Sequence, residues 1–258
     1  MESRGSDHLR GMKKLAIPGV VYLLVLFYLP FFIVVLYSLG FPNFTLEFYA
    51  EVLDPWFFKF FLNSLLIATI TTVLCLVLAY PVAYYIALRA QRWKNLLLVL
   101  IILPFWISLL LRTYAVMVIL TPLGLMFTFT AVVIGMVYDY FPFMVLPLYA
   151  SLEKLKRSQL EASYILGASP LKTFLKVTLP HSKPGIVAGI MLVFIPSFGE
   201  FVVPSMLGGT YVTIGTLTWD LFLRYHDWWR GSAISVIYMA IVLIAIAIYM
   251  KKAGRIEL

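Results

Sequence analysis

Charged residues are scarce in this sequence. Only 12% of its 258 residues are Asp, Glu, Lys or Arg, whereas 62% are hydrophobic. An average globular domain is about a quarter charged and about half apolar. A soluble domain of this length cannot bury so much apolar surface, so lipid is the expected solvent for most of the chain.

Residues that hold metals or carry out catalysis are also few. The single cysteine, Cys75, lies inside an apolar run, which excludes a disulfide framework and a thiolate metal cluster. His8, His181 and His226 are far apart and show no metal-ligand spacing. No Gly-x-x-x-x-Gly-Lys-Ser/Thr loop is present, so the chain cannot bind ATP by that mechanism. We find no Ser/His or His/Asp constellation within the apolar runs, so we expect neither an enzyme nor a cofactor bound by this chain.

Six apolar runs are long enough to cross a bilayer, which takes roughly 20 residues per helix. Irregular backbone cannot face lipid, so the runs are predicted to be helices. The sequence thus predicts an all-α membrane protein with six transmembrane helices. The first run is longer than the apolar part of a signal peptide and is expected to be retained. The runs lie near residues 15–40, 60–88, 95–120, 128–150, 184–205 and 229–250.

Basic residues give the orientation. With the N-terminus inside, all but four of the 20 Lys and Arg residues fall in cytoplasmic segments, Arg255 at the C-terminal end among them; the exceptions are Lys59, Arg112, Arg224 and Arg230. The positive-inside rule therefore predicts that both termini are cytoplasmic. It also accounts for the net charge of +8 without nucleic-acid binding.

A polar, basic segment, residues 151–183, interrupts the apolar runs on the cytoplasmic side. Ser169 followed by Pro170 is typical of a helix start, and Gly167 suits the turn that ends a preceding helix. Leu171, Phe174, Leu175 and Thr178 would share one face of the second helix. The pattern predicts a helix-turn-helix, and it leaves open whether this unit rests on lipid headgroups or binds another protein.

The same segment carries a motif. Glu161-Ala162-Ser163, then Gly167, Val177 and Leu179-Pro180, resembles the EAA loop with which permease subunits of ABC importers contact their ATPase. The resemblance implies a type I ABC-importer (MetI-like) permease fold, a single transmembrane domain over residues 1–258 with its core at about 60–250, and a coupling loop at 151–183. It implies that Ala162, Gly167, Ala168 and Ser169 lie near the ATPase and that Glu161 orients the loop. ATP and Mg would be bound by the partner.

Three ionisable residues lie within predicted spans: Arg112, Asp139 and Glu200. Such residues are costly in lipid and usually face the interior of a helix bundle. Asp139 is expected about 16 Å from the outer end of its helix, near the membrane midplane. Arg112 could form a structural ion pair with Glu200 or with Asp139. Alternatively, the three could line a cavity for an organic cation together with aromatic residues, which include Trp106, Tyr138 and Phe141.

Further segments narrow the resemblance. Residues 199–209, Phe105-Trp106, Arg112-Thr113-Tyr114 and 141–149 are similar to spermidine/putrescine permease subunits, most closely the B-type. The resemblance implies a bacterial inner-membrane importer of polyamines with two copies of an ATP-binding subunit, a second, non-identical permease and an extracytoplasmic polyamine-binding protein. Permeases for ferric iron, thiamine, or sulfate and molybdate share the loop and stay as alternatives. An ion-coupled carrier is disfavoured because inverted hydropathy repeats are absent.

Overall fold

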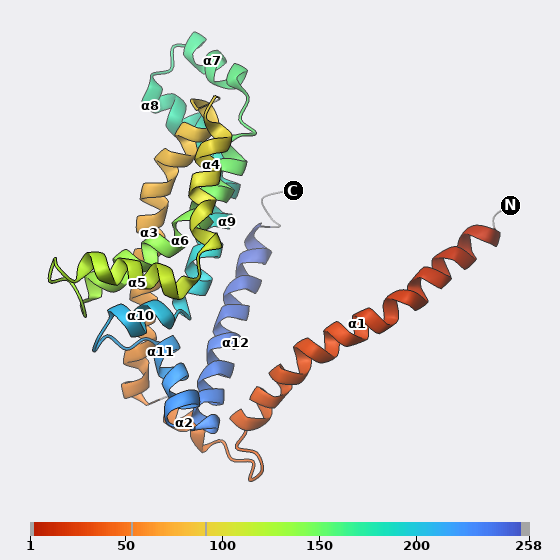
Figure 1. Ribbon diagram of the computed structural model, residues 1–258. Coiled ribbons are helices and arrows are strands. Elements are labelled where there is room, and N and C mark those ends of the chain that lie inside the picture. Colours follow the sequence, from red (N-terminus) through yellow and green to blue (C-terminus); the bar gives the residue numbers. More distant parts are fainter. Residues whose placement is uncertain (1–2, 53, 91, 254–258) are drawn as a thin grey trace. The chain divides into compact units, whose positions relative to one another are not determined.

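The structure, a computed structural model, describes residues 3–52, 54–90 and 92–253, and these residues form helices and turns without any strand (Figure 1). The chain divides into two compact units. Unit 1 combines Met1–Phe57 with Asp220–Leu258, and unit 2 is Phe58–Trp219. The expected all-α class is confirmed within the described residues.

Unit 1 contains the first and last long helices. α1 (Ser3–Ser38) and the short α2 (Glu47–Val52) both pack against α12 (Trp228–Ala253), which follows a π-helical turn, η3 (Asp220–Arg224). The Arg230 side chain of α12 forms ion pairs with Glu51 and Asp227. Every side chain from residue 18 to 33 is exposed, so the apolar surface of α1 has no cover within its own unit.

Unit 2 begins with the long helix α3, which spans Pro55–Leu88 and crosses the boundary between the units. A basic turn leads to α4 (Lys94–Ile102), the 3-10 turn η1 (Leu103–Trp106) and α5 (Leu109–Leu120). The Lys94 ammonium group pairs with Glu153, which joins the start of α4 to the end of α6 (Phe129–Leu152).

The segment 151–183 and the remaining helices complete unit 2. α7 (Arg157–Ile165) and α8 (Pro170–Thr173) precede a π-helical turn, η2 (Phe174–Thr178), which continues directly into α9 (Leu179–Phe198). Two short helices, α10 (Val202–Leu207) and α11 (Ile214–Trp219), end the unit. Pro170–Phe198 is therefore one helical span, whereas the sequence predicts a separate short helix before the membrane run.

The core of unit 2 is centred on the packing of α6 against α9. Two glycines of α9 allow close approach, as small residues four apart do in membrane helices. A Cβ atom at Gly185 would lie 2.6 Å from the Pro147 carbonyl oxygen, and one at Gly189 would lie 2.5 Å from the Met144 sulfur. Large side chains of α6 fill the core beside them; Met136, Met144, Val145, Leu148 and Leu152 are fully buried.

Two predicted helices are interrupted. The run 95–120 is a bent pair, with a 98° change of direction between Lys94–Trp106 and Leu109–Leu120. Ile107 is extended, and the Ser108 hydroxyl caps the new helix by accepting from the Leu111 N–H at 3.3 Å. The long helix of the run 184–205 ends at Phe198, so Glu200 lies in a non-helical break, whereas the sequence predicts it within a helical span.

Each of the six predicted runs corresponds to one helix or helix pair. Within the described part of the chain, four helices are long and apolar enough to cross a membrane, and the bent pair would make a fifth. The apolar part of α12, Trp228–Ile244, is shorter. The count of six spans and the cytoplasmic termini stay predictions, and Arg255 lies outside the described residues.

Candidate functional site

The turn of the hairpin formed by α7 and α8 is built around Gly167. Its φ of +76° is left-handed, a conformation that costs other residues free energy. The Gly167 N–H donates to the Tyr164 carbonyl at 2.9 Å, and the Ala168 N–H donates to the Ser163 carbonyl at 3.1 Å. This pair of bonds is a Schellman motif, which ends α7. The predicted glycine turn is confirmed.

Side-chain hydrogen bonds join the two helices of the hairpin. The Ser169 hydroxyl accepts from the Lys172 N–H at 3.3 Å, which confirms the predicted N-cap of α8. The hydroxyls of Ser163 and Thr173 lie 2.8 Å apart, and Ser163 also donates to the Leu160 carbonyl. Because a serine hydroxyl has only one proton, Thr173 is the donor to Ser163. Ser163, which replaces the second alanine of the motif, therefore fastens α7 to α8.

Apolar side chains are exposed at the tip of this hairpin. Ile165 and Leu166 are each 86% exposed, and Leu171 and Leu175 are also exposed. Of the four residues predicted to share one face, Thr178 is buried and Phe174 is half-buried, whereas the two leucines are exposed. Exposed apolar residues gathered at a polar, basic segment indicate an interaction surface.

Most residues of the segment that resembles the EAA loop are exposed. Ala162, Gly167 and Ser169 are exposed, and Ala168 is half-buried. The exposed Glu161 carboxylate lies 4.0 Å from the Arg157 guanidinium, one helical turn earlier. α9 begins with Leu179, which is half-buried, and Pro180, which is exposed. In Figure 1 α7 and α8 form a hairpin at the end of unit 2 where α3 ends and α4 begins.

The structure brings Arg112 of α5 to Asp139 of α6. The two side chains are only 9% and 4% exposed, and Arg112 Nη1 lies 3.3 Å from Asp139 Oδ1. Neither of these atoms, nor Arg112 Nε, makes an aligned hydrogen bond. A buried ion pair gains little unless further hydrogen bonds satisfy its atoms. The pair is therefore buried, and only part of its hydrogen-bonding capacity is used.

Glu200 is held differently. One of its carboxylate oxygens accepts from the backbone N–H groups of Phe201 and Val202, at 3.0 and 2.8 Å. The other accepts from the Tyr140 hydroxyl at 2.8 Å. Glu200 thus caps the start of α10 and ties it to α6, and Arg112 pairs with Asp139 instead.

Aromatic rings connect the two acidic positions. The Arg112 guanidinium lies 5.9 Å from the centre of the Phe105 ring, which is 4.8 Å from that of Phe143. Phe143 in turn lies 6.0 Å from the ring of Tyr140, the donor to Glu200. Charged groups and rings from η1, α5, α6 and the α9–α10 break therefore form one continuous cluster.

The other predicted pathway residues lie apart from this cluster. Trp106 is 76% exposed at the end of η1, and Tyr138 is exposed on α6. Phe141 is half-buried, about 200° around α6 from Asp139. Tyr138 and Phe141 therefore lie on other faces of α6 than the carboxylate, and a shared cavity for these residues stays a prediction.

Tyr140 was not identified from the sequence as the partner of Glu200. The two residues are 60 positions apart, and their bond depends on the break after α9. No group of three or more His, Cys, Asp or Glu side chains among the described residues is arranged to hold a metal ion.

Comparison with known proteins identifies the class. Residues 76–253 match the family model described as binding-protein-dependent transport system inner membrane component. The chain belongs to this family, and it is a multi-pass protein of the cytoplasmic membrane.

Two curated relatives are similar to the chain over about four fifths of its length. The chain is 41% identical over 228 residues to the spermidine/putrescine transport system permease protein PotB of Salmonella typhimurium (strain LT2), covering 81% of this chain and 79% of the relative. It is 36% identical to the protein of that name from Haemophilus influenzae, with 80% and 79% covered.

Among solved structures, a bacterial ABC transporter involved in alginate import aligns with a TM-score of 0.74 at 15% identity, over 99% of both chains. A second structure, of a bacterial alginate ABC transporter in complex with an alginate pentasaccharide-bound periplasmic protein, aligns with a TM-score of 0.75 at 14% identity, over 98% of this chain and 97% of the other. At this level of identity, the likeness establishes the permease fold alone.

Proposed function

We propose that this chain is a membrane-spanning subunit of an ATP-driven importer that carries polyamines of the spermidine and putrescine type into the cell. The observation that carries the substrate is the 41% identity to a spermidine/putrescine permease over 81% of the chain. The fold does not select the substrate, because a transporter of the acidic polysaccharide alginate shares it.

The charges of the membrane cluster agree with a cationic substrate. Asp139 and Glu200 supply two carboxylates, against one guanidinium from Arg112. The excess negative charge would attract an ammonium group of a protonated polyamine, and the rings of Phe105 and Phe143 beside Arg112 can contact its ammonium groups or its methylenes. In this proposal Asp139 binds substrate after releasing Arg112, whereas Glu200 mainly supports the local backbone.

In this proposal the hairpin of α7 and α8 links the permease to its ATP-binding subunit. Its exposed tip, with Ile165 and Leu166, docks on an ATP-binding subunit, two copies of which serve this chain and a second, non-identical permease. An extracytoplasmic binding protein delivers the polyamine, in agreement with the family description. Six spans with both termini in the cytoplasm place the hairpin on the side where ATP is available.

Uptake into proteoliposomes tests the substrate. The whole importer is reconstituted into liposomes with ATP inside. Binding protein loaded with labelled spermidine is supplied outside, and the accumulation of spermidine in the liposomes is measured. We expect ATP-dependent uptake that excess putrescine suppresses and excess molybdate or thiamine does not. Transport of molybdate or thiamine, with no polyamine uptake, would reject the proposal.

A matched pair of variants tests Asp139. Asp139→Asn alone leaves Arg112 buried without a counter-charge, which costs about 3–5 kcal/mol of stability. The double variant Arg112→Gln/Asp139→Asn removes both charges and should restore assembly, measured by co-purification with the ATPase. We expect its spermidine uptake to stay at least ten-fold below wild type. Full uptake by the double variant would show that the pair is structural only.

A further inference from the structure

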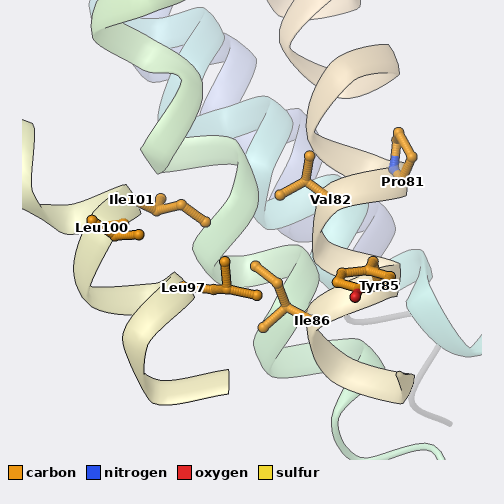
Figure 2. A pocket seen from close by; sticks show the side chains of 7 residues that line it. All are labelled: Pro81, Val82, Tyr85, Ile86, Leu97, Leu100 and Ile101. Atoms are coloured by element: carbon orange, nitrogen blue, oxygen red, sulfur yellow. The ribbon is translucent and has the colours of Figure 1, made fainter. Parts of the chain in front are cut away.

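An apolar groove opens on the outside of unit 2 between α3 and α4. It has a volume of about 430 Å³. In Figure 2, Val82 and Ile86 of α3 and Leu97 and Ile101 of α4 extend into the space between the two helices. All are apolar except for the hydroxyl of one tyrosine; the lining residues are Pro81, Val82, Tyr85, Ile86, Leu97, Leu100 and Ile101. A groove of this size is within the range of small-ligand sites.

The groove adjoins the membrane surface. Tyr85 and Ile86 are in the last turn of α3, and Leu97 is in the first turn of α4. Trp93, in the turn that joins these helices, is 60% exposed, and Tyr85 is 57% exposed. Exposed Trp and Tyr side chains are typical of the headgroup level of a bilayer. The apolar part of the groove therefore extends from this level toward the acyl chains.

Positive charge lies at the open end. Arg89 follows Tyr85 by one helical turn, and its N–H donates to the Tyr85 carbonyl at 2.9 Å. Arg92 is in the same turn, and both arginines are exposed. Among the described residues, no carboxylate pairs with either arginine, whereas the nearby Lys94 is paired with Glu153. Two unpaired arginines above an apolar groove complement a lipid that has a negative headgroup.

We propose that this groove is a binding site for an anionic phospholipid. One acyl chain lies between α3 and α4, and the phosphate group accepts hydrogen bonds from Arg89 and Arg92. Basic pockets between transmembrane helices bind acidic headgroups in this way. None of the lining residues belongs to the polyamine cluster or to the docking hairpin, so the proposal does not depend on the proposed function.

Lipid retention tests the site. The full importer is placed in nanodiscs of equal parts phosphatidylglycerol and phosphatidylethanolamine, released, and analysed for bound lipid by native mass spectrometry. We expect phosphatidylglycerol to be retained in preference to phosphatidylethanolamine. Arg89→Gln and Arg92→Gln should each reduce its retention about five-fold. Leu100→Trp, which fills the groove, should reduce it without altering the charge, and Lys251→Gln, an exposed basic residue elsewhere, should not change it.

Two results would overturn the proposal. One is equal retention of both lipids by wild type and by the arginine variants. The other is efficient cross-linking of the Leu100→Cys variant to the second permease, which would show that a protein helix covers the groove. Retention lost in Arg89→Gln and in Leu100→Trp, with folding shown by unchanged thermal unfolding, supports the lipid.

Discussion

At the scale of single residues, Asp139 and Glu200 differ in how their charges are stabilised. Glu200 accepts three hydrogen bonds, two of them from backbone N–H groups. Asp139 faces one guanidinium without an aligned hydrogen bond. A carboxylate whose bonds are filled by its own chain is a poor site for an incoming ligand, so Asp139 is the better candidate for substrate binding.

The difference predicts opposite tolerance at position 200. Glu200→Gln keeps one oxygen for the two backbone N–H groups, and its amide can donate to the Tyr140 hydroxyl, so stability should change little. Glu200→Ala leaves the Phe201 and Val202 N–H groups without their acceptor and should lower the free energy of unfolding by about 1–3 kcal/mol. Thermal unfolding of the purified protein measures both.

The exposed Glu47 provides the control for that comparison, since Glu47→Ala should stay within about 0.5 kcal/mol of wild type. Equal losses for Glu200→Ala and Glu200→Gln would show instead that the negative charge itself stabilises the break.

At the scale of elements, the apolar runs predict the positions of the long helices because burial in lipid requires continuous apolar sequence. The bends are harder to predict. Pro104 and Ser108 mark the break between α4 and α5, but neither gives the 98° angle. The break at Glu200 depends on Tyr140, a partner from another helix, and the pairing of Arg112 with Asp139 rather than Glu200 depends on that same geometry.

The hairpin was more predictable because its signals are local. Ser169, Pro170 and Gly167 act through the backbone of their neighbours, and each has the predicted role. The orientation of Leu171 and Leu175 was not predictable, because the surface that covers an apolar face can belong to another chain.

Gly167 allows a test that separates backbone strain from steric clash. A Cβ at this position would meet no atom within 4 Å, so only the left-handed φ resists substitution. Gly167→Asn should be tolerated, because asparagine adopts this conformation readily. Gly167→Val should cost about 1–2 kcal/mol or more and reduce binding-protein-stimulated ATP hydrolysis about ten-fold, with normal membrane insertion. Equal activity of the two variants would contradict the role of the turn in docking.

At the scale of the whole molecule, single ion pairs join elements distant in sequence in both units. In unit 1 Glu51 of α2 pairs with Arg230 of α12, and in unit 2 Glu153 pairs with Lys94. The hydrogen bond from Arg230 holds the pKa of Glu51 below its usual value. The hydrogen bond from Lys94, helped by Tyr149, does the same for the pKa of Glu153.

Acid should therefore weaken both links. A carboxyl group whose pKa is lowered by folding stabilises the protein above its unfolded pKa of about 4.5, and this contribution disappears as the pH falls through the lower, folded pKa. Both carboxylates are exposed, so the effect is small and screened by salt. The midpoint temperature of thermal unfolding should be lower at pH 3.5 than at pH 6. The decrease should be smaller in the double variant Glu51→Gln/Glu153→Gln than in wild type. An identical fall in both would assign the acid sensitivity to other groups.

The absence of a break between α8 and α9 has a mechanical consequence. From Pro170 to Phe198 the chain is one helical rod about 40 Å long. One end of the rod begins at the exposed hairpin, and the other ends two residues before Glu200. We therefore expect a displacement of the hairpin to be transmitted along this helix to the break where Glu200 meets Tyr140. The hairpin and the membrane cluster are thus connected by one continuous helix, and the π-helical turn η2, Pro184 and Pro196 are the points where it can bend.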